Sequence, residues 1–331
     1  MTPDISVIVP AKNAGTYLRQ CLQSIQDQHY IHNFEVIVLV AASCDDTLKI
    51  ACEFEAADSR FRVEYYDHSI GKTRRHGISL AKGEWIAFVD ADDVIHPWYL
   101  LQMFSCTGGS YLPTRHAGPL VVMCDWARTE DELSSCGDWE TITGRTALRR
   151  LAMGEWFDYT VVWGKLWHRD VFNIYNFPDA GISEEQELVH HIYSSLHLLS
   201  TDRDYIVHIK RKLYMWRDNP SSLTNQRFDE SRLYHIECGM RRLNFYDSIR
   251  DDGIASLMSQ RLVLDCMWTQ AELQKAGCSA DSIYRVKLIR KKTLRRIMRD
   301  RLIPLRRKLH LAVVCSTPKF ARVFGDSVYD W

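Results

Sequence analysis

The sequence has 331 residues, of which 46% are hydrophobic and 25% are charged, and its formal net charge is zero. These values indicate an ordinary soluble globular protein with one large domain or two smaller ones. No run of about 18 uncharged apolar residues is present, and the start, MTPDISVIVP, lacks the basic segment of a signal peptide, so we expect neither a transmembrane helix nor a secretion signal.

The first hundred residues alternate between apolar runs and helical periodicity. Strands are predicted at 5–10, 34–40, 61–66 and 84–89, with helices at 15–28, 45–57 and 72–83 between them. This alternation predicts βαβ units and an α/β fold with a mostly parallel sheet flanked by helices. In such sheets, ligands bind outside the carboxyl ends of the strands.

Polar residues follow three of these strands, in the segments PAKN (10–13), AASCDD (41–46) and DADD (90–93). We expect the three loops to converge on one crevice. Asp90, Asp92 and Asp93 are hard oxygen ligands on one short loop, which suit Mn²⁺ or Mg²⁺ when substrate phosphates complete the shell. The alternative is an acidic turn that only favours the start of the next helix.

Beyond residue 140 the pattern becomes helical, with helices predicted at 146–157 and 184–199 and an extended segment or strand pair at 205–216. Glu184 and Glu185 begin the second of these helices. A carboxylate in a partly apolar cleft has the raised pKa that a general base needs. The alternative is that both are first-turn acids favoured by the helix dipole. His190 and His191, further along, are interpreted as plain helix residues.

The cysteines bear on the cellular compartment of the chain, and the basic residues bear on its partners. Its ten cysteines are scattered, without a Cys-x-x-Cys pair or histidines at zinc-ligand spacing, which favours reduced thiols in the cytoplasm. Residues 285–308 contain twelve Lys or Arg and one acid, a net charge of +11. Apolar residues recur among them at helical spacing: Ile283, Val286, Ile289, Leu294, Ile297, Met298 and Leu302.

This spacing predicts a basic amphipathic helix, and residues 283–324 are expected to lie on an anionic membrane surface. Nucleic acid is the rival anion, but the aromatic and glycine interleaving of an RNA-binding segment is missing, so no nucleic-acid partner is expected. The alternative is that the apolar stripe packs on the rest of the protein.

Six segments, in order over about residues 4–225, resemble the GT-A fold glycosyltransferases of family 2. They are ISVIVPAKNAGTYLRQCLQSIQDQ (5–28), SCDDT (43–47), GKTRRHGISLAKGEWIAFVDADD (71–93), VVWGKLWHRDVF (161–172), GISEEQEL (181–188) and LYMWRDNPSSLT (213–224). The resemblance implies a Rossmann-like catalytic domain at 1–227, with a donor half at 1–105 and an acceptor half at 106–227. A helical region with the basic tail would follow at 228–331.

The resemblance also implies roles for individual residues. Glu185 matches the catalytic base, and Glu184 is the acid before it. Asp90 and Asp92 match the metal-binding D-x-D acids, with Asp93 the following acid. The implied donor-binding residues are Pro10, Asn13, Ser43, Asp45, Arg74, Asp90 and Lys165, and the implied acceptor-side residues are Trp163, Trp216 and Arg217. Lys165 has an alternative interpretation, in which its stem lies over the neighbouring tryptophans.

The implied function is transfer of a sugar, with inversion and with Mn²⁺ or Mg²⁺, from a nucleotide-sugar to a glycan or lipid-linked acceptor in cell-surface polysaccharide synthesis. The enzyme would work in the cytoplasm, peripherally at the inner face of the plasma membrane. A dinucleotide-binding enzyme is disfavoured because no G-x-G-x-x-G follows the first strand.

One departure from the family pattern concerns the donor. The family usually has two acids at the end of its second strand, and here Val40 and Ala41 stand there. A contact to the base or ribose is therefore missing or is supplied by Asp45, Asp67 or Lys12. Two alternatives follow: a transferase that does not use UDP, or a non-catalytic glycosyltransferase-like binding subunit.

Overall fold

The structure is a computed structural model that describes residues 2–30, 33–108, 118–153, 159–180, 184–199, 205–220, 222 and 228–316. The chain divides into two compact units, one of residues 1–146 and 161–220 and one of residues 147–160 and 221–331. Most of the segment between Pro220 and the sequence-derived boundary at 227 lies outside the described residues, so that boundary stays a prediction.

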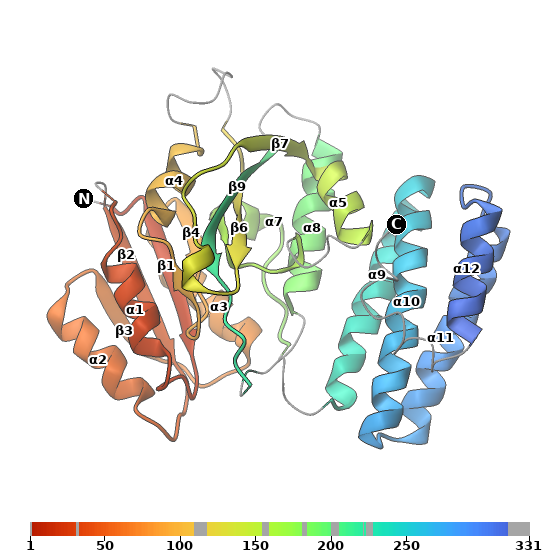
Figure 1. Cartoon of the computed structure of the whole chain (residues 1–331), viewed down its shortest axis with the longest axis horizontal. Coiled ribbons are helices and arrows are strands. Elements are labelled where there is room, and N and C mark those ends of the chain that lie inside the picture. Colours follow the sequence, from red (N-terminus) through yellow and green to blue (C-terminus); the bar gives the residue numbers. More distant parts are fainter. Residues whose placement is uncertain are drawn as a thin grey trace. The chain divides into compact units, whose positions relative to one another are not determined.

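The first unit is built on one mixed sheet, in the order β3-β2-β1-β4-β8-β6-β9-β5, with β7 paired to β9 (Figure 1). Its strands are β1 (Ile5–Ala11), β2 (Phe34–Val40), β3 (Phe61–Tyr65), β4 (Trp85–Phe88), β5 (Val94–Ile95), β6 (Val121–Ala127), β7 (Trp139–Thr143), β8 (Lys165–His168) and β9 (Tyr205–Met215). The helices that accompany them are α1 (Leu18–Gln26), α2 (Thr47–Ala57), α3 (Ile70–Leu80), α4 (Tyr99–Ser105), α7 (Val171–Ile174) and α8 (Glu184–Leu199), with a 3₁₀ turn at Glu130–Glu132.

Strands β3, β2, β1 and β4 are parallel to their neighbours, so their carboxyl ends lie at one edge of the sheet. Strand β1 is buried along almost its whole length, which agrees with its mostly apolar sequence, rich in β-branched residues. Beyond β4 the sheet becomes mixed, because β8 runs antiparallel to both β4 and β6. The α/β class predicted from the sequence is confirmed, and its parallel part is the N-terminal half.

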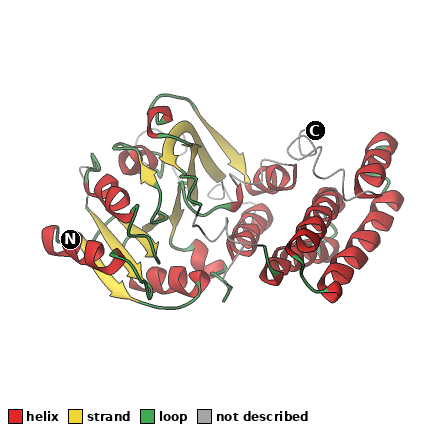
Figure 2. Cartoon of the chain, turned by 60° about the horizontal axis from the view of Figure 1, so that its bottom comes forward, coloured by secondary structure: helices red, strands yellow, loops and turns green. Residues whose placement is uncertain are grey.

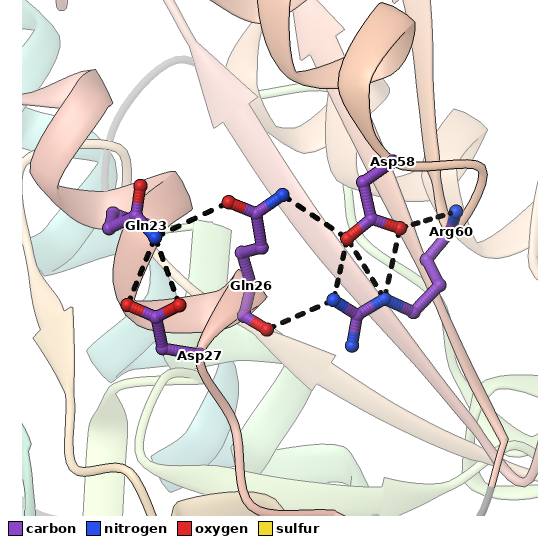
Figure 3. A network of polar contacts seen from close by, with 5 residues as sticks. All are labelled: Gln23, Gln26, Asp27, Asp58 and Arg60. Carbon is purple, nitrogen blue, oxygen red and sulfur yellow. Dashed lines mark hydrogen bonds and ion pairs between the residues drawn. The ribbon is translucent and has the colours of Figure 1, made fainter.

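A polar network outside the crevice joins α1 to the turn before β3 (Figure 3). The Arg60 guanidinium donates to the Asp58 carboxylate and to the Gln26 carbonyl, and the Gln26 amide also donates to Asp58. Gln23 donates to Asp27 at the end of the same helix. The hydrogen bonds from Arg60 lower the pKa of Asp58 to about 2, so this carboxylate stays charged at neutral pH.

The second unit is helical in its described part, as Figure 2 shows by the absence of strands there. Its helices are the greater part of α5 (Gly144–Met153), then α9 (Leu233–Ser248), α10 (Asp252–Ala276), α11 (Ala280–Arg299) and α12 (Leu305–Ser316), with a 3₁₀ turn at Glu230–Arg232. Helix α10 packs against α9, α11 and α12, which explains why fifteen of its residues are buried. The helical region predicted beyond residue 228 is therefore a bundle of several helices.

A buried ion network lies within this bundle. Asp265 on α10 pairs with Arg261 one turn earlier and with His235 on α9. Burial acts against its charge, but these two partners lower the pKa of Asp265 far below its usual value. The bundle therefore contains charges that satisfy one another in its interior.

Candidate active site

Two loops that follow β1 and β2 are locked together by hydrogen bonds. The Asn13 backbone N–H donates to the Ser43 hydroxyl at 3.0 Å, and the Cys44 N–H donates to the Asn13 side-chain oxygen at 3.0 Å. Asn13 has a φ of 48°, a conformation that asparagine tolerates better than most residues. The side chains of Asn13 and Ser43 thus shape the loops, and their contact with a donor stays a prediction.

Asp45 also ties these loops. Its carboxylate accepts from the Gly15 N–H at 2.8 Å and from the Thr47 N–H at 3.1 Å. Partial burial opposes ionisation, but these hydrogen bonds and the Thr47 hydroxyl lower the pKa of Asp45. Pro10, another predicted donor-binding residue, is the next-to-last residue of β1 and is half-buried.

The structure brings Val40 and Ala41 to the carboxyl end of β2, where the departure from the family pattern was noted. Both side chains are buried, and Ala41 is bonded through its N–H to the Ala11 carbonyl. Beyond β3, Asp67 pairs with Lys12 at 3.5 Å across the exposed mouth of these loops. Two charged side chains therefore lie near the position where acids were expected on β2.

Arg74 sits on α3, and two features fix the start of this helix. Ser69 caps it, accepting from the Lys72 N–H. Gly71 passes so close to the Pro178 carbonyl that a Cβ at this position would lie 2.1 Å from its oxygen. The same segment carries Phe177, whose ring centroid lies 5.7 Å from the Arg74 guanidinium carbon. Residues 177–180 therefore hold Arg74 in place.

Three carboxylates surround Arg74. Its Nη1 contacts Glu184 and also Glu185, the latter at 2.5 Å, and its Nη2 contacts Asp90 at 2.9 Å. The arginine side chain is only 5% exposed. Burial alone would lower its pKa, but the three carboxylates raise it, so Arg74 stays charged. One guanidinium thus joins the start of α8 to the loop after β4.

The two glutamates differ in access to solvent. The Glu184 side chain is buried, whereas that of Glu185 is 16% exposed. Burial raises the pKa of Glu185 to about 7; Arg74 opposes this shift, and the nearby charges of Glu184 and Asp90 add to it. Burial also raises the pKa of Glu184. Glu185 is therefore a partly accessible carboxyl that can gain or lose a proton near neutral pH.

The acids at 90–93 are held by the end of β9. The Tyr214 hydroxyl donates to Asp93 at 2.6 Å and accepts from the Asp90 N–H at 3.1 Å. Arg217 donates from its backbone N–H to the other Asp93 oxygen and from Nε to the Asp92 carbonyl. Both oxygens of Asp93 are thus engaged within the protein. Its buried carboxyl has a pKa raised by burial, and also by Asp90 and Asp92.

Asp90 and Asp92 remain as candidate metal ligands. Asp90 pairs through Oδ1 with Arg74, and Asp92 accepts through Oδ2 from the Asn219 amide at 2.8 Å. Burial, and then the charge of Asp90, raises the pKa of Asp92, which a cation would counteract. Within the described ranges, no group of three or more His, Cys, Asp or Glu side chains could hold a metal.

This donor set fits a cation whose shell is completed by substrate phosphates, because Mg²⁺ is usually held by one or two carboxylates only. It does not fit the sequence-based expectation that three acids gather around the ion. We therefore keep Asp90 and Asp92 as the proposed ligands, and assign Asp93 to the network with Tyr214 and Arg217.

Lys165 and Trp163 lie deep beside this loop. Lys165 is only 2% exposed, and its ammonium donates to the Val161 carbonyl at 2.6 Å. Trp163 stacks on Tyr214, with ring centroids 4.6 Å apart. Both side chains are buried and are bonded to or packed on the protein itself. Direct contact of Lys165 with a donor and of Trp163 with an acceptor therefore stays a prediction.

An aromatic group continues from Trp163 toward the surface. Trp126 on β6 meets Trp163 and Trp216 edge-on, and the Arg128 guanidinium carbon lies 4.2 Å from the Trp216 ring centroid. Trp216 is half-buried, as is Arg217, whose Nη2 donates to Gln20. Trp126 and Trp216 thus form a half-buried aromatic wall that continues from the buried Trp163.

Sequence reasoning missed Trp126, Arg128, Tyr214 and Asn219. Tyr214 and Asn219 flank Trp216 and Arg217 in the segment LYMWRDNPSSLT, whose resemblance to the family could have identified them. Trp126 and Arg128 depend on the pairing of β6 with β9, which has no local signal. His190 bonds within α8 to Ser194, and His191 stacks on Tyr175, so both fit the predicted interpretation as helix residues.

Comparison with known sequences identifies relatives. The model of the family described as "Glycosyl transferase family 2" matches residues 6–105. "Putative glycosyltransferase EpsH" of Bacillus subtilis is 29% identical over 234 residues, which cover 68% of this chain and 64% of EpsH, slightly less than two thirds of its length. "Putative teichuronic acid biosynthesis glycosyltransferase TuaG" of the same species is 34% identical over 93 residues, or 28% of this chain and 36% of TuaG.

Among solved structures, S. aureus TarS 1-349 in complex with UDP is similar, with a TM-score of 0.56. The match covers 87% of this chain and 90% of that chain, at 18% identity. An identity this low supports a shared fold and nothing finer.

Proposed function

Because the chain belongs to glycosyl transferase family 2, we propose that it moves a sugar from a nucleotide-sugar donor to a hydroxyl of a glycan or lipid-linked acceptor, with inversion. The observation that carries this proposal is the cluster in which Arg74 joins Glu184 and Glu185 to Asp90. It brings a carboxyl that can act as a base next to the acids that would bind a donor.

Glu185 is the proposed base. Its pKa of about 7 allows the carboxylate to take the proton of the acceptor hydroxyl at neutral pH. That oxygen then forms a bond to C1 of the sugar, while the bond from C1 to the diphosphate breaks and the diphosphate leaves with the electron pair. Attack opposite to the leaving group inverts the configuration at C1.

Glu184 and Arg74 are better suited to positioning. Both are almost fully buried, and Arg74 is already paired with three carboxylates. In this proposal, Arg74 fixes the distance between the base and Asp90, and its charge keeps the nearby carboxylates from repelling each other. This role differs from the direct contact with the diphosphate that the family resemblance implies.

Asp90 and Asp92 are the proposed ligands of Mn²⁺ or Mg²⁺. When bound, the ion would neutralise charge on the departing diphosphate. Asn219 and Arg217 orient Asp92 through its side-chain oxygen and its backbone carbonyl. Oriented partners of this kind fix a ligand before the ion arrives.

The nucleotide is proposed to bind over the loops after β1 and β2. TarS is described in complex with UDP, which makes UDP-sugars the first donors to consider. Val40 and Ala41 favour the alternative of a donor that is not UDP, because neither side chain can form a hydrogen bond with a base or a ribose. Lys12 and Asp67 are the charged residues that could take over this contact.

The acceptor is proposed to belong to cell-surface polysaccharide synthesis, because the name of TuaG refers to teichuronic acid biosynthesis. The half-buried aromatic wall of Trp126 and Trp216 supports a sugar-bearing acceptor. We propose that the reaction takes place in the cytoplasm, since the ten cysteines are free thiols. Its position at the inner face of the plasma membrane is proposed from the net charge of +11 on residues 285–308.

A screen of nucleotide-sugars tests this proposal. The protein is mixed with each donor and Mn²⁺, and both binding and slow hydrolysis to the nucleoside diphosphate are measured, with EDTA as the control. We expect at least one donor to be bound and hydrolysed in a metal-dependent way. If every donor is ignored at millimolar concentration, the chain is a binding subunit and not a transferase.

A further inference from the structure

Part of the apolar stripe predicted for the basic tail faces the interior of the bundle, whereas two of its members, Met298 and Leu302, are exposed. Val286 and Ile297 are fully buried, and Leu294 packs against a core that includes Val263 and Met267 of α10. The sequence-based expectation that this stripe enters a membrane is therefore wrong for these residues. Residues 317–324 of the expected membrane segment lie outside the described residues.

Other apolar side chains of this region point to solvent. On α11 and α12 and in the turn between them, seven large apolar side chains are between 42% and 69% exposed: Tyr284, Leu288, Met298, Leu302, Leu305, Leu309 and Val313. We call these seven residues the outer apolar set. They make up nearly half of the large exposed apolar side chains in the described part of the chain.

Helical geometry aligns the members of this set. On α11, Tyr284, Leu288 and Met298 follow one line with Lys291 and Arg295, at spacings of four, three, four and three residues. The buried residues Ser282, Val286 and Thr293 lie two positions earlier, about 200° away around the helix. The line therefore runs along the side opposite to the core.

Helix α12 has the same organisation. Leu305, Leu309 and Val313 are spaced by four residues and form one exposed line, whereas Leu311 and Val314 are buried against α10 and α11. Both helices are in contact with α10 and with each other. Each one thus packs an inner apolar face and exposes an outer one.

Cations lie among the outer apolar residues. Lys287, Lys291, Lys292, Arg295, Arg299 and Arg301 are exposed, and none of the six makes an ion pair in the described part of the chain. By contrast, Arg285 and Arg296 pair with Glu237 and Asp247 of α9. Asp300 is the single acid between residues 284 and 313. The outer face is therefore strongly positive and unneutralised.

We propose that the outer faces of α11 and α12 dock on an anionic bilayer surface, with the outer apolar set entering the headgroup region and the six cations contacting lipid phosphates. We choose a lipid surface as the partner because binding to it uses both features of this face. The apolar side chains leave water, and the cations contact negative headgroups. A nucleic acid would use the cations alone and leave the apolar set exposed. Within the described residues, none of the helices combines the length and the apolar character that a membrane span requires.

Cosedimentation of the full-length protein with vesicles tests this docking. We expect binding to vesicles of mixed phosphatidylglycerol and phosphatidylcholine, weak binding to phosphatidylcholine alone, and loss of binding in high salt. The triple variant Lys291→Gln, Lys292→Gln, Arg295→Gln should bind anionic vesicles about a hundredfold more weakly. The triple variant Leu288→Gln, Leu305→Gln, Leu309→Gln should also bind more weakly.

Matched controls come from the first unit, where Leu48→Gln and Lys49→Gln change exposed side chains of α2 and should leave vesicle binding unchanged. Circular dichroism establishes that each variant is folded. The inference fails if the parent protein ignores anionic vesicles at low salt, if the apolar variant binds as tightly as the parent, or if an oligonucleotide is bound in preference to vesicles. Donor binding, measured on the same samples, is independent of these outcomes and tests the proposed function separately.

Discussion

At the scale of single residues, Asp92 and Asp93 show how neighbouring acids take different roles. Both carboxylate oxygens of Asp93 accept hydrogen bonds, from Tyr214 and Arg217. Asp92 accepts from Asn219 through Oδ2, and its Oδ1 is the atom proposed to bind a cation. We therefore expect Asp92→Asn to weaken Mn²⁺-dependent donor binding by at least about 100-fold, while the fold is preserved. Isothermal titration with and without EDTA measures this effect. Donor binding that is equally tight in the variant and the parent would remove Asp92 from the metal site.

The ionisation of Glu185 sets the expected pH dependence. The base must be deprotonated, and its pKa is raised to about 7 by burial and then by Glu184 and Asp90, with Arg74 and Lys165 opposing. Activity should thus rise with pH up to about 7, falling roughly tenfold for each unit below that value. The pH profile of kcat/KM measures this limb. A profile already flat from pH 5 upward would mean that a carboxyl of ordinary pKa, or no carboxyl, limits the reaction.

Ala41 allows a test of donor choice. Both side chains are buried, but Ala41 lies just beyond β2 whereas Val40 is part of the strand, so Ala41→Asp is the less disruptive change. A restored acid at this position should tighten UDP binding by about 1–3 kcal/mol. Ala41→Val is the control for volume, and it should not improve binding. If Ala41→Asp leaves the UDP affinity unchanged, another residue already makes the contact.

At the scale of elements, the start of α3 depends on a close approach of two segments. A Cβ on Gly71 would meet the Pro178 carbonyl at 2.1 Å, and backbone cannot move aside easily. We expect Gly71→Ala to cost about 1–3 kcal/mol of stability and to reduce donor turnover, because Arg74 is one turn further along the helix. Thermal unfolding and a hydrolysis assay measure the two effects.

Ser79→Ala, an exposed change on the same helix, is the control for Gly71→Ala and should be close to the parent in both assays. An unchanged melting temperature and turnover in Gly71→Ala would show that the segment at 177–180 does not fix α3. In that case Arg74 would owe its position to its carboxylate partners alone.

Some helices and strands could be predicted from the sequence and others could not. Strands β1, β2 and β4 were predicted because each is a mostly apolar run next to helical segments. The strands β6 to β8 were not predicted: β7 is half-exposed, β8 has only four residues, and all three are defined by pairing with distant segments. On α11, periodicity located the apolar residues correctly, but it could not tell whether they face a membrane or a neighbouring helix.

At the scale of the whole molecule, the α/β fold predicted from the sequence is confirmed, and the predicted family agrees with the family model that matches residues 6–105. They were predictable because six ordered segments carry them. The interactions within the site were not predictable: the contacts of Asp93 and the aromatic partners of Trp163 arise where β9 returns to the loop after β4. Such contacts are set by the fold and leave no local pattern.

Glu185 is proposed as the base of a sugar transfer, and the variant Glu185→Gln removes the carboxylate while it keeps the size of the side chain. Donor turnover is measured beside donor affinity for the parent, for Glu185→Gln and for Glu53→Gln, an exposed control on α2. We expect Glu185→Gln to lose about 10²–10⁴-fold in turnover and still to bind donor, and Glu53→Gln to behave as the parent. Turnover in Glu185→Gln within a few-fold of the parent would contradict it.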